Sequence, residues 1–139
     1  MQNYTFAANI MNESKMKIIH SLRFKQIAAA GFYLLILLGS SVPGQNIPKI
    51  FKFTPDKLIH VLEYTVLGWL LIRWLRHQFP HPAMVYGAMA AGVCCAVLDE
   101  SYQKLIPNRS SDVWDASIDA VGVALGILIF TLFNRKMNL

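Results

Sequence analysis

The side chains that could do chemistry in this sequence lie in stripes at helical spacing. Residues three, four or seven positions apart share one face of a helix. Two stripes carry three ionisable residues each, and a third carries an acid and an amide: Asp56, His60 and Glu63; Asp112, Asp115 and Asp119; Glu100 and Gln103. An imidazole can act as a general base, and a carboxyl group can act as an acid or bind a metal ion. His60, Glu100 and Asp115 are therefore the candidate catalytic residues.

The helices that would carry these residues belong to a chain whose composition is typical of a membrane protein. Of its 139 residues, 55% are hydrophobic and 15% are charged, whereas soluble domains have about 25% charged residues. Basic residues flank apolar runs, which indicates membrane topology and not the binding of nucleic acid. The two cysteines, Cys94 and Cys95, are adjacent, so they predict neither a zinc site nor a disulfide framework.

Four apolar segments approach the length of about 20 residues that a bilayer crossing needs. They are expected at 27–42, at 56–75, at 83 to about 103, and from a cap at Ser110 or Ser111 to about 133. We therefore predict an all-α membrane protein, a four-transmembrane-helix bundle, over residues 26–139. Residues 1–25 are polar and mixed, and they form a separate N-terminal segment that is either disordered or a short amphipathic helix on the membrane surface.

The distribution of basic residues predicts how these segments cross the membrane. With four crossings, both termini and the 73–81 loop share one side, which holds eight of the 13 basic residues: Lys15, Lys17, Arg23, Lys25, Arg73, Arg76, Arg135 and Lys136. The opposite side holds the other five: Lys49, Lys52, Lys57, Lys104 and Arg109. Because excess positive charge marks the cytoplasmic side, we expect a multi-pass protein with both termini in the cytoplasm.

Acidic residues are concentrated at the outer ends of the predicted helices. Seven of the eight acids lie there, and Glu13 is the exception. Asp119 lies about two turns into its helix, roughly 12 Å at 1.5 Å per residue, and a charge near the middle of the bilayer costs about 2.5–3.5 kcal/mol. The acids must therefore face each other, water or a cation, and Arg109 and His60 are their expected internal partners. Shared protons or a bound divalent cation would neutralise the rest.

The residues expected to bind a ligand are those of the inward stripes and the arginine that follows the third helix: Asp56, His60, Glu100, Gln103, Arg109, Asp115 and Asp119. Of these, His60, Glu100, Arg109 and Asp115 are expected to meet in one pocket near the outer surface. Gly122 and Gly126 continue the acidic face of the last helix, so that face is also expected to pack against a neighbouring helix. Tyr64 is interpreted equally well as a packing aromatic or as a proton donor.

Two stretches of the sequence resemble a known family. "DKLIHVLEYTVLG" followed by "DESYQKLIPNRSSDVWDASIDAVGVALG" looks like the VanZ-like family of small bacterial integral membrane proteins, from about Asp56 to Gly126. The shared motifs are D-K-x-x-H-x-x-x-Y and E-x-x-Q-x(5)-R-x(5)-D. The family pattern usually has asparagine where this chain has Asp119, so that position carries an extra acid or a coupled proton. The resemblance implies the bacterial cytoplasmic membrane and a cell-envelope setting linked to resistance to glycopeptides such as teicoplanin, and it implies no particular reaction.

Three classes of function fit these features. The favoured class is a protein that binds or modulates a cell-envelope lipid or lipid-linked cell-wall precursor, with Arg109 as the contact to its anionic head. The second is a membrane enzyme that acts on a lipid-linked substrate by acid/base or metal-assisted chemistry, although G-x-S-x-G, H-E-x-x-H and a Gly-rich phosphate loop are missing. The third is a structural polar network in a larger membrane assembly.

Overall fold

Four helices make up the fold of the computed structural model, which describes the backbone of residues 2–43, 56–109 and 113–137 and the side chains within 21–43, 57–109 and 114–134. The helices are α1 (Gln2–Ser40), α3 (Asp56–Leu75), α4 (Ala83–Gln103) and α5 (Val113–Met137). Each contains a segment long and apolar enough to cross a membrane, and the described residues form no strand. The predicted all-α, four-helix membrane fold is confirmed.

The helix boundaries follow from helix breakers in the sequence. α3 and α4 begin and end where the sequence predicts, because proline residues precede both helices and a turn with Pro80 and Pro82 separates them. α5 runs from Val113 to Met137, a little later at both ends than expected. The predicted caps Ser110 and Ser111 lie outside the described residues.

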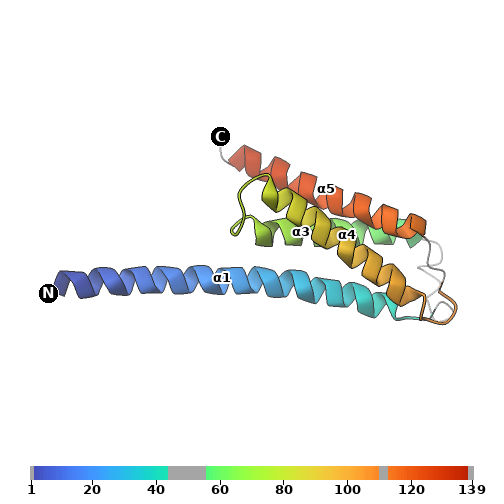
Figure 1. Ribbon diagram of the computed structural model, residues 1–139, viewed down its shortest axis with the longest axis horizontal. Helices are drawn as coiled ribbons and strands as arrows, with labels where there is room; N and C mark the ends of the chain where they lie inside the picture. Colours follow the sequence, from blue (N-terminus) through green and yellow to red (C-terminus); the bar gives the residue numbers. More distant parts are fainter. Residues whose placement is uncertain (1, 44–55, 110–112, 138–139) are drawn as a thin grey trace.

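α1 is longer than the membrane segment predicted within it. It runs from Gln2 to Ser40 without a break, because residues 1–30 contain neither proline nor glycine. Its N-terminal half extends well beyond the other helices (Figure 1). The helix therefore passes the expected boundary between residues 25 and 26. The side chains of residues 1–20 lie outside the described part, so the amphipathic surface proposed for this segment stays a prediction.

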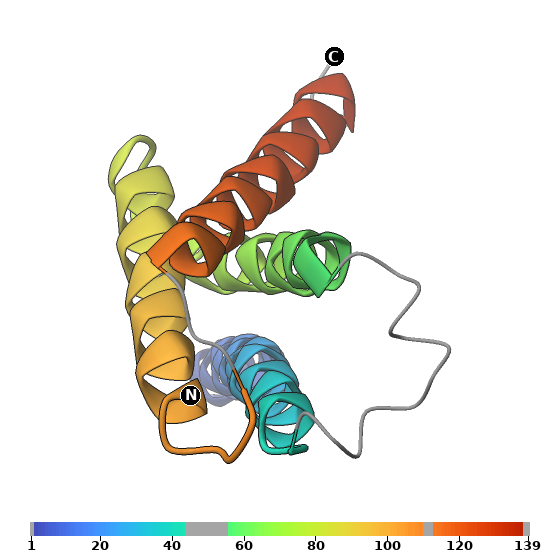
Figure 2. The same cartoon turned by 90° about the vertical axis from the view of Figure 1, so that its right-hand side faces the viewer.

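The helices are packed around α3. α3 contacts α5 most extensively and also contacts α4 and α1, and it lies between α1 and α5 (Figure 2). Successive helices alternate in direction, so α1 and α4 end, and α3 and α5 begin, at the same end of the bundle. We call this the polar end, because it holds the buried ionisable residues His60, Asp99 and Asp119. The opposite end, with the turn at 76–82, is called the basic end.

Glycines allow α3 and α5 to come very close. A Cβ atom at Gly122 would lie 2.7 Å from the carbonyl oxygen of Val61, and one at Gly126 would overlap the carbonyl oxygen of Thr65. Ordinary side chains would hold the two backbones apart at both positions. The face of the last helix that the sequence assigns to packing is thus the face that contacts α3.

The outer surface of the bundle is apolar, and several polar residues are buried in its interior. Large apolar side chains are exposed along the outside of the bundle, as on Leu34, Leu62 and Leu128. The buried polar or charged residues, in contrast, gather near the polar end: Ser40, His60, Asp99, Glu100, Gln103 and Asp119. This pattern fits a protein whose outer surface contacts lipid and whose polar groups must find partners inside.

Candidate functional site

The candidate site is a buried polar cluster at the polar end, contributed by all four helices. His60 lies one turn after the start of α3, and Asp119 lies about two turns into α5. Asp99 lies one turn before the end of α4, and Ser40 is the last residue of α1. The alternating helix directions bring these positions, which are far apart in sequence, to similar depths.

His60 and Asp119 form the centre of the cluster. The Nδ1 atom of His60 lies 2.9 Å from Oδ1 of Asp119, and the two residues are 5% and 0% exposed. Among the side chains that the structure describes, this is the only acid–base contact short enough for an ion pair, which would form if His60 were protonated. The close packing at Gly122 places the two helices near enough for it. Asp119 therefore pairs directly with His60.

Asp99 is the second buried carboxylate. Its Oδ2 atom accepts a hydrogen bond from Nε2 of Gln103 at 3.2 Å and a longer one from the hydroxyl of Tyr64 at 3.5 Å. Nε2 of Gln103 also donates to the hydroxyl oxygen of Ser40 at 3.2 Å. The amide of Gln103 thus joins α1 to α4 and fixes the orientation of the Asp99 carboxyl group.

His60, Asp99 and Asp119 converge closely enough to share one ligand. Each offers one nitrogen or oxygen atom, and these atoms all lie within 4.8 Å of one another. Oδ1 of Asp99 and Oδ2 of Asp119 are buried and accept no hydrogen bond from a described residue. Buried carboxylate oxygens without a donor are costly. The arrangement can hold a proton, a metal ion or a hydrogen-bond donor of a ligand.

The other predicted site residues lie around this cluster. Glu100 is buried and interacts with a neighbour, whereas Asp115 is half-buried in the first turn of α5 and is not part of the three-residue group. α3 begins at Asp56, but the side chain of this residue lies outside the described part of the structure. Asp112 lies outside the described residues altogether. The expected meeting of Glu100 and Asp115 with His60 in one pocket stays a prediction.

Arg109 follows α4 in a tight turn at the polar end. Asn108 adopts a positive φ of 58°, which asparagine tolerates better than most residues, and the chain reverses there toward α5. Arg109 is half-buried, and its Nε atom has no hydrogen-bond partner within the described ranges. No described acid forms an ion pair with it, so the expectation that acids hold Arg109 stays a prediction.

Sequence reasoning overlooked Asp99, which the structure places at the centre of the site. The signal for Asp99 is the spacing of the buried residues on α4, which are Ala88, Gly92, Ala96, Asp99, Glu100 and Gln103. The three residues that precede Asp99 in this set are small. Asp99 follows Ala96 by three positions and precedes Gln103 by four, so it continues that face. Tyr64, which follows His60 by four positions on α3, is fully buried and contacts this same acid.

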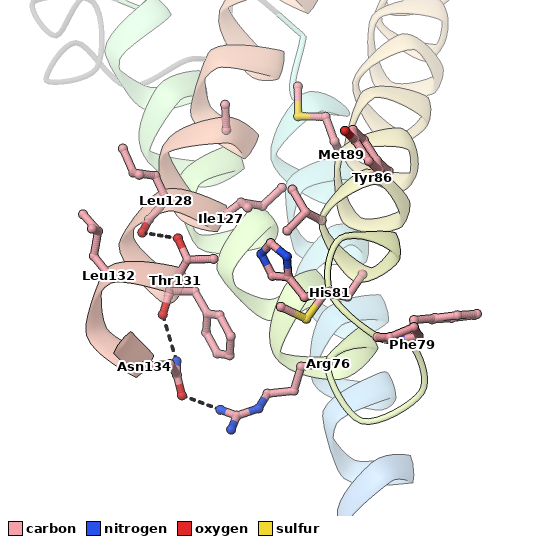
Figure 3. A pocket seen from close by; sticks show the side chains of 15 residues that line it. Arg76, Phe79, His81, Tyr86, Met89, Ile127, Leu128, Thr131, Leu132 and Asn134 are labelled. Carbon is pink, nitrogen blue, oxygen red and sulfur yellow. Dashed lines mark hydrogen bonds between the residues drawn. The ribbon is translucent and has the colours of Figure 1, made fainter. Parts of the chain in front are cut away.

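A separate groove opens between α4 and α5 near the basic end. Figure 3 shows His81 and Tyr86 on one side, Ile127 and Leu128 on the other, and Arg76 directed toward Asn134. Its lining is mostly apolar, and it contains none of the clustered acids. A mostly apolar lining of this kind suits the chains of a lipid better than polar chemistry.

A family model described as VanZ/LLP1 matches residues 3–134. The chain belongs to the VanZ/LLP1 family. The match includes the polar segment at the N-terminus as well as the membrane helices, and the resemblance to VanZ-like proteins is confirmed. No match was found to a curated protein or to a solved structure.

Proposed function

We propose that this VanZ/LLP1 protein binds the polar head group of a cell-envelope lipid or lipid-linked cell-wall precursor at its polar end. The observation that carries the proposal is the buried cluster of His60, Asp99, Glu100 and Asp119 in a bundle with an apolar outer surface. Polar groups placed inside a membrane protein at a cost mark a ligand or ion pathway. An amphiphile in the surrounding membrane would bring its head group to this depth.

The unsatisfied groups indicate what the head group contains. Buried carboxylate oxygens on Asp99 and Asp119 require a donor or a cation, and Nε of Arg109 requires an acceptor. A head group that carries a phosphate together with amine or hydroxyl groups would satisfy both requirements. Arg109 would contact the phosphate with its planar guanidinium group, and either the donors of the head group or a cation would satisfy the carboxylates.

The charges at the basic end support a cytoplasmic location for both termini. Arg73 and Arg76 lie over the rings of Trp69 and Phe130, at 5.2 and 5.5 Å from the ring centres, as expected for arginines at a membrane interface. With this end in the cytoplasm, the polar end faces outward, where cell-wall precursors are used. Altered presentation of such a precursor would change susceptibility to glycopeptides such as teicoplanin.

A membrane enzyme is the second candidate function. It is favoured by one contact, the pair between His60 and Asp119, because a carboxylate that holds an imidazole orients it as a general base. Such an enzyme would use His60 to activate water or a hydroxyl group against a lipid-linked substrate. An assay with a lipid-linked precursor would distinguish this function from binding alone. The wild type should form a product, and His60→Gln should form none.

Arg109 provides the sharpest test of head-group binding. Purified protein would be mixed with phosphatidylglycerol, undecaprenyl phosphate and a lipid-linked cell-wall precursor, and bound lipid would be measured by native mass spectrometry. Arg109→Ala should weaken binding of at least one probe by about tenfold or more, since a buried charge-assisted contact contributes about 1.5–3 kcal/mol. Arg109→Lys should recover only part, because lysine lacks the planar fork.

Lys104→Ala is the matched control, because Lys104 is an exposed cation at the same end of the bundle. It should bind like the wild type. Equal binding by wild type, Arg109→Ala and Lys104→Ala would refute the anion contact. A loss of folding in both Arg109 variants, measured by size-exclusion chromatography, would favour the structural network instead.

A further inference from the structure

The triad of His60, Asp99 and Asp119 has the composition and position of a metal site. We propose that it binds one divalent transition-metal ion, such as Zn²⁺ or Mn²⁺, through one nitrogen and two carboxylate oxygens. The proposal goes beyond the binding of a lipid and does not depend on it. It rests on the convergence of the three side chains and on two buried carboxylate oxygens without described donors.

The distances between the ligand atoms suit a metal ion. Zinc–nitrogen and zinc–oxygen bonds of about 2.0–2.2 Å separate neighbouring ligand atoms by about 3.3–3.6 Å in a tetrahedral site. Nδ1 of His60 and Oδ1 of Asp119 are 2.9 Å apart, and the full set lies within 4.8 Å. To bind the ion, His60 and Asp119 must move slightly apart and Asp99 must move closer to them. Small side-chain rotations on the helices can achieve both changes.

The charges of the triad balance those of a divalent ion. With a neutral imidazole, the two ionised carboxylates carry two negative charges, and both residues are fully buried. Unneutralised charge at this depth is costly. A proton shared between His60 and Asp119 would neutralise part of this charge, but it would leave Oδ1 of Asp99 without a partner. An ion between the three residues would contact every side chain at once.

Neighbouring residues hold Asp99 in the orientation that a metal ligand needs. Gln103 and Tyr64 both donate to Oδ2 of Asp99, which leaves Oδ1 as the atom available for an ion. Hydrogen bonds of this kind to a ligating carboxylate are typical of metal sites. The imidazole ligand favours Zn²⁺ and the two carboxylates also suit Mn²⁺, whereas Ca²⁺ and Mg²⁺ are bound by oxygen ligands.

Metal content is measured on the protein purified in detergent, with any affinity tag removed. After treatment with EDTA, the protein is titrated with ZnCl₂, MnCl₂ or MgCl₂, and bound metal is counted by inductively coupled plasma mass spectrometry. We expect about one Zn²⁺ or Mn²⁺ per chain and little Mg²⁺. Melting temperature should rise with bound metal and stop rising at one equivalent, because an ion that binds only the folded state stabilises it.

Variants then assign the ligands. Asp99→Asn and Asp119→Asn keep the side-chain shape but remove the charge, and each should weaken binding by about 100-fold or more. Glu63→Gln is the matched control, because Glu63 is a half-buried acid on α3 outside the triad, and it should bind metal like the wild type.

Two results would overturn the proposal. One is EDTA-treated wild-type protein that binds no Zn²⁺ or Mn²⁺ when it is titrated with these ions and shows no change in melting temperature. The other is equal metal binding by wild type and both Asn variants. Should those variants fail to fold, Co²⁺ titration of the wild type decides, because an imidazole–carboxylate site gives a saturable visible absorption band and non-specific binding does not.

Discussion

The close approach of α3 and α5 predicts that Gly126→Ala destabilises the protein. A Cβ atom at this position would overlap the carbonyl oxygen of Thr65 and would lie 2.7 Å from the amide nitrogen of Trp69. Both neighbours are backbone atoms, so no side chain can rotate away. The two helices must therefore separate until these contacts reach about 3.5 Å, the distance of ordinary packing.

The size of the effect follows from two opposing terms. Overpacking of a tight contact costs about 1–3 kcal/mol, whereas exchanging glycine for alanine within a helix gains up to about 1 kcal/mol. We expect a net loss of up to about 2 kcal/mol. Gly31→Ala supplies the control, because Gly31 lies in α1 with nothing within 4 Å of the added atom. This variant receives the helix gain alone and should be as stable as the wild type or more so.

Unfolding in mixed micelles of detergent and dodecyl sulfate, followed by circular dichroism, would measure both variants. A second measurement, Zn²⁺ binding, tests whether packing sets the site geometry. Gly126 lies two turns from Asp119 on the same face of α5, so a displaced helix should also weaken metal binding. If Gly126→Ala were as stable as Gly31→Ala, the helices would not be packed as closely as described and the argument would fail.

Two further outcomes are expected. In a cysteine-free background, a cysteine at Asn108 should react with an impermeant reagent added outside cells and one at Gln78 should not; the reverse would place the polar end in the cytoplasm. Burial and the positive charge of Lys25 lower the pKa of His77, which accepts a hydrogen bond at 2.8 Å from Nζ of Lys25. Protonation is therefore disfavoured in the folded state, so stability should fall as pH drops below about 6.5. His77→Gln should reduce this fall in melting temperature, and an unchanged profile would contradict the assignment.

The sequence predicts the fold well because membrane helices leave strong local signals. The limits of α3 and α4 follow from proline residues and the length of apolar runs, both visible without tertiary contacts. The glycine face of α5 could be predicted for the same reason, since Gly122 and Gly126 have the four-residue spacing of close helix pairs. The long continuation of α1 toward Gln2 was not expected, because polar composition alone does not end a helix.

The candidate site could be predicted only in part, because spacing shows which residues share a face but not which faces meet. His60 and Asp119 belong to the predicted stripes, and the structure brings them together. Asp99 and Glu100 are adjacent acids, and the sequence motif directed attention to Glu100. The rotation of α4 about its axis decides between them, and that rotation is set by packing of Gly92 and Ala96, which no local pattern of charges reveals.

Packing and chemistry are coupled at the polar end. The glycines of α5 set its distance from α3, and this distance in turn brings an acid to 2.9 Å from a histidine in a place where charge is costly. A purely structural network would be more stable with uncharged partners, because buried ion pairs rarely repay the loss of solvation. A structure that nevertheless keeps two carboxylates buried around one imidazole is better explained by a ligand that needs them. The triad of His60, Asp99 and Asp119 is therefore where the search for that ligand should begin.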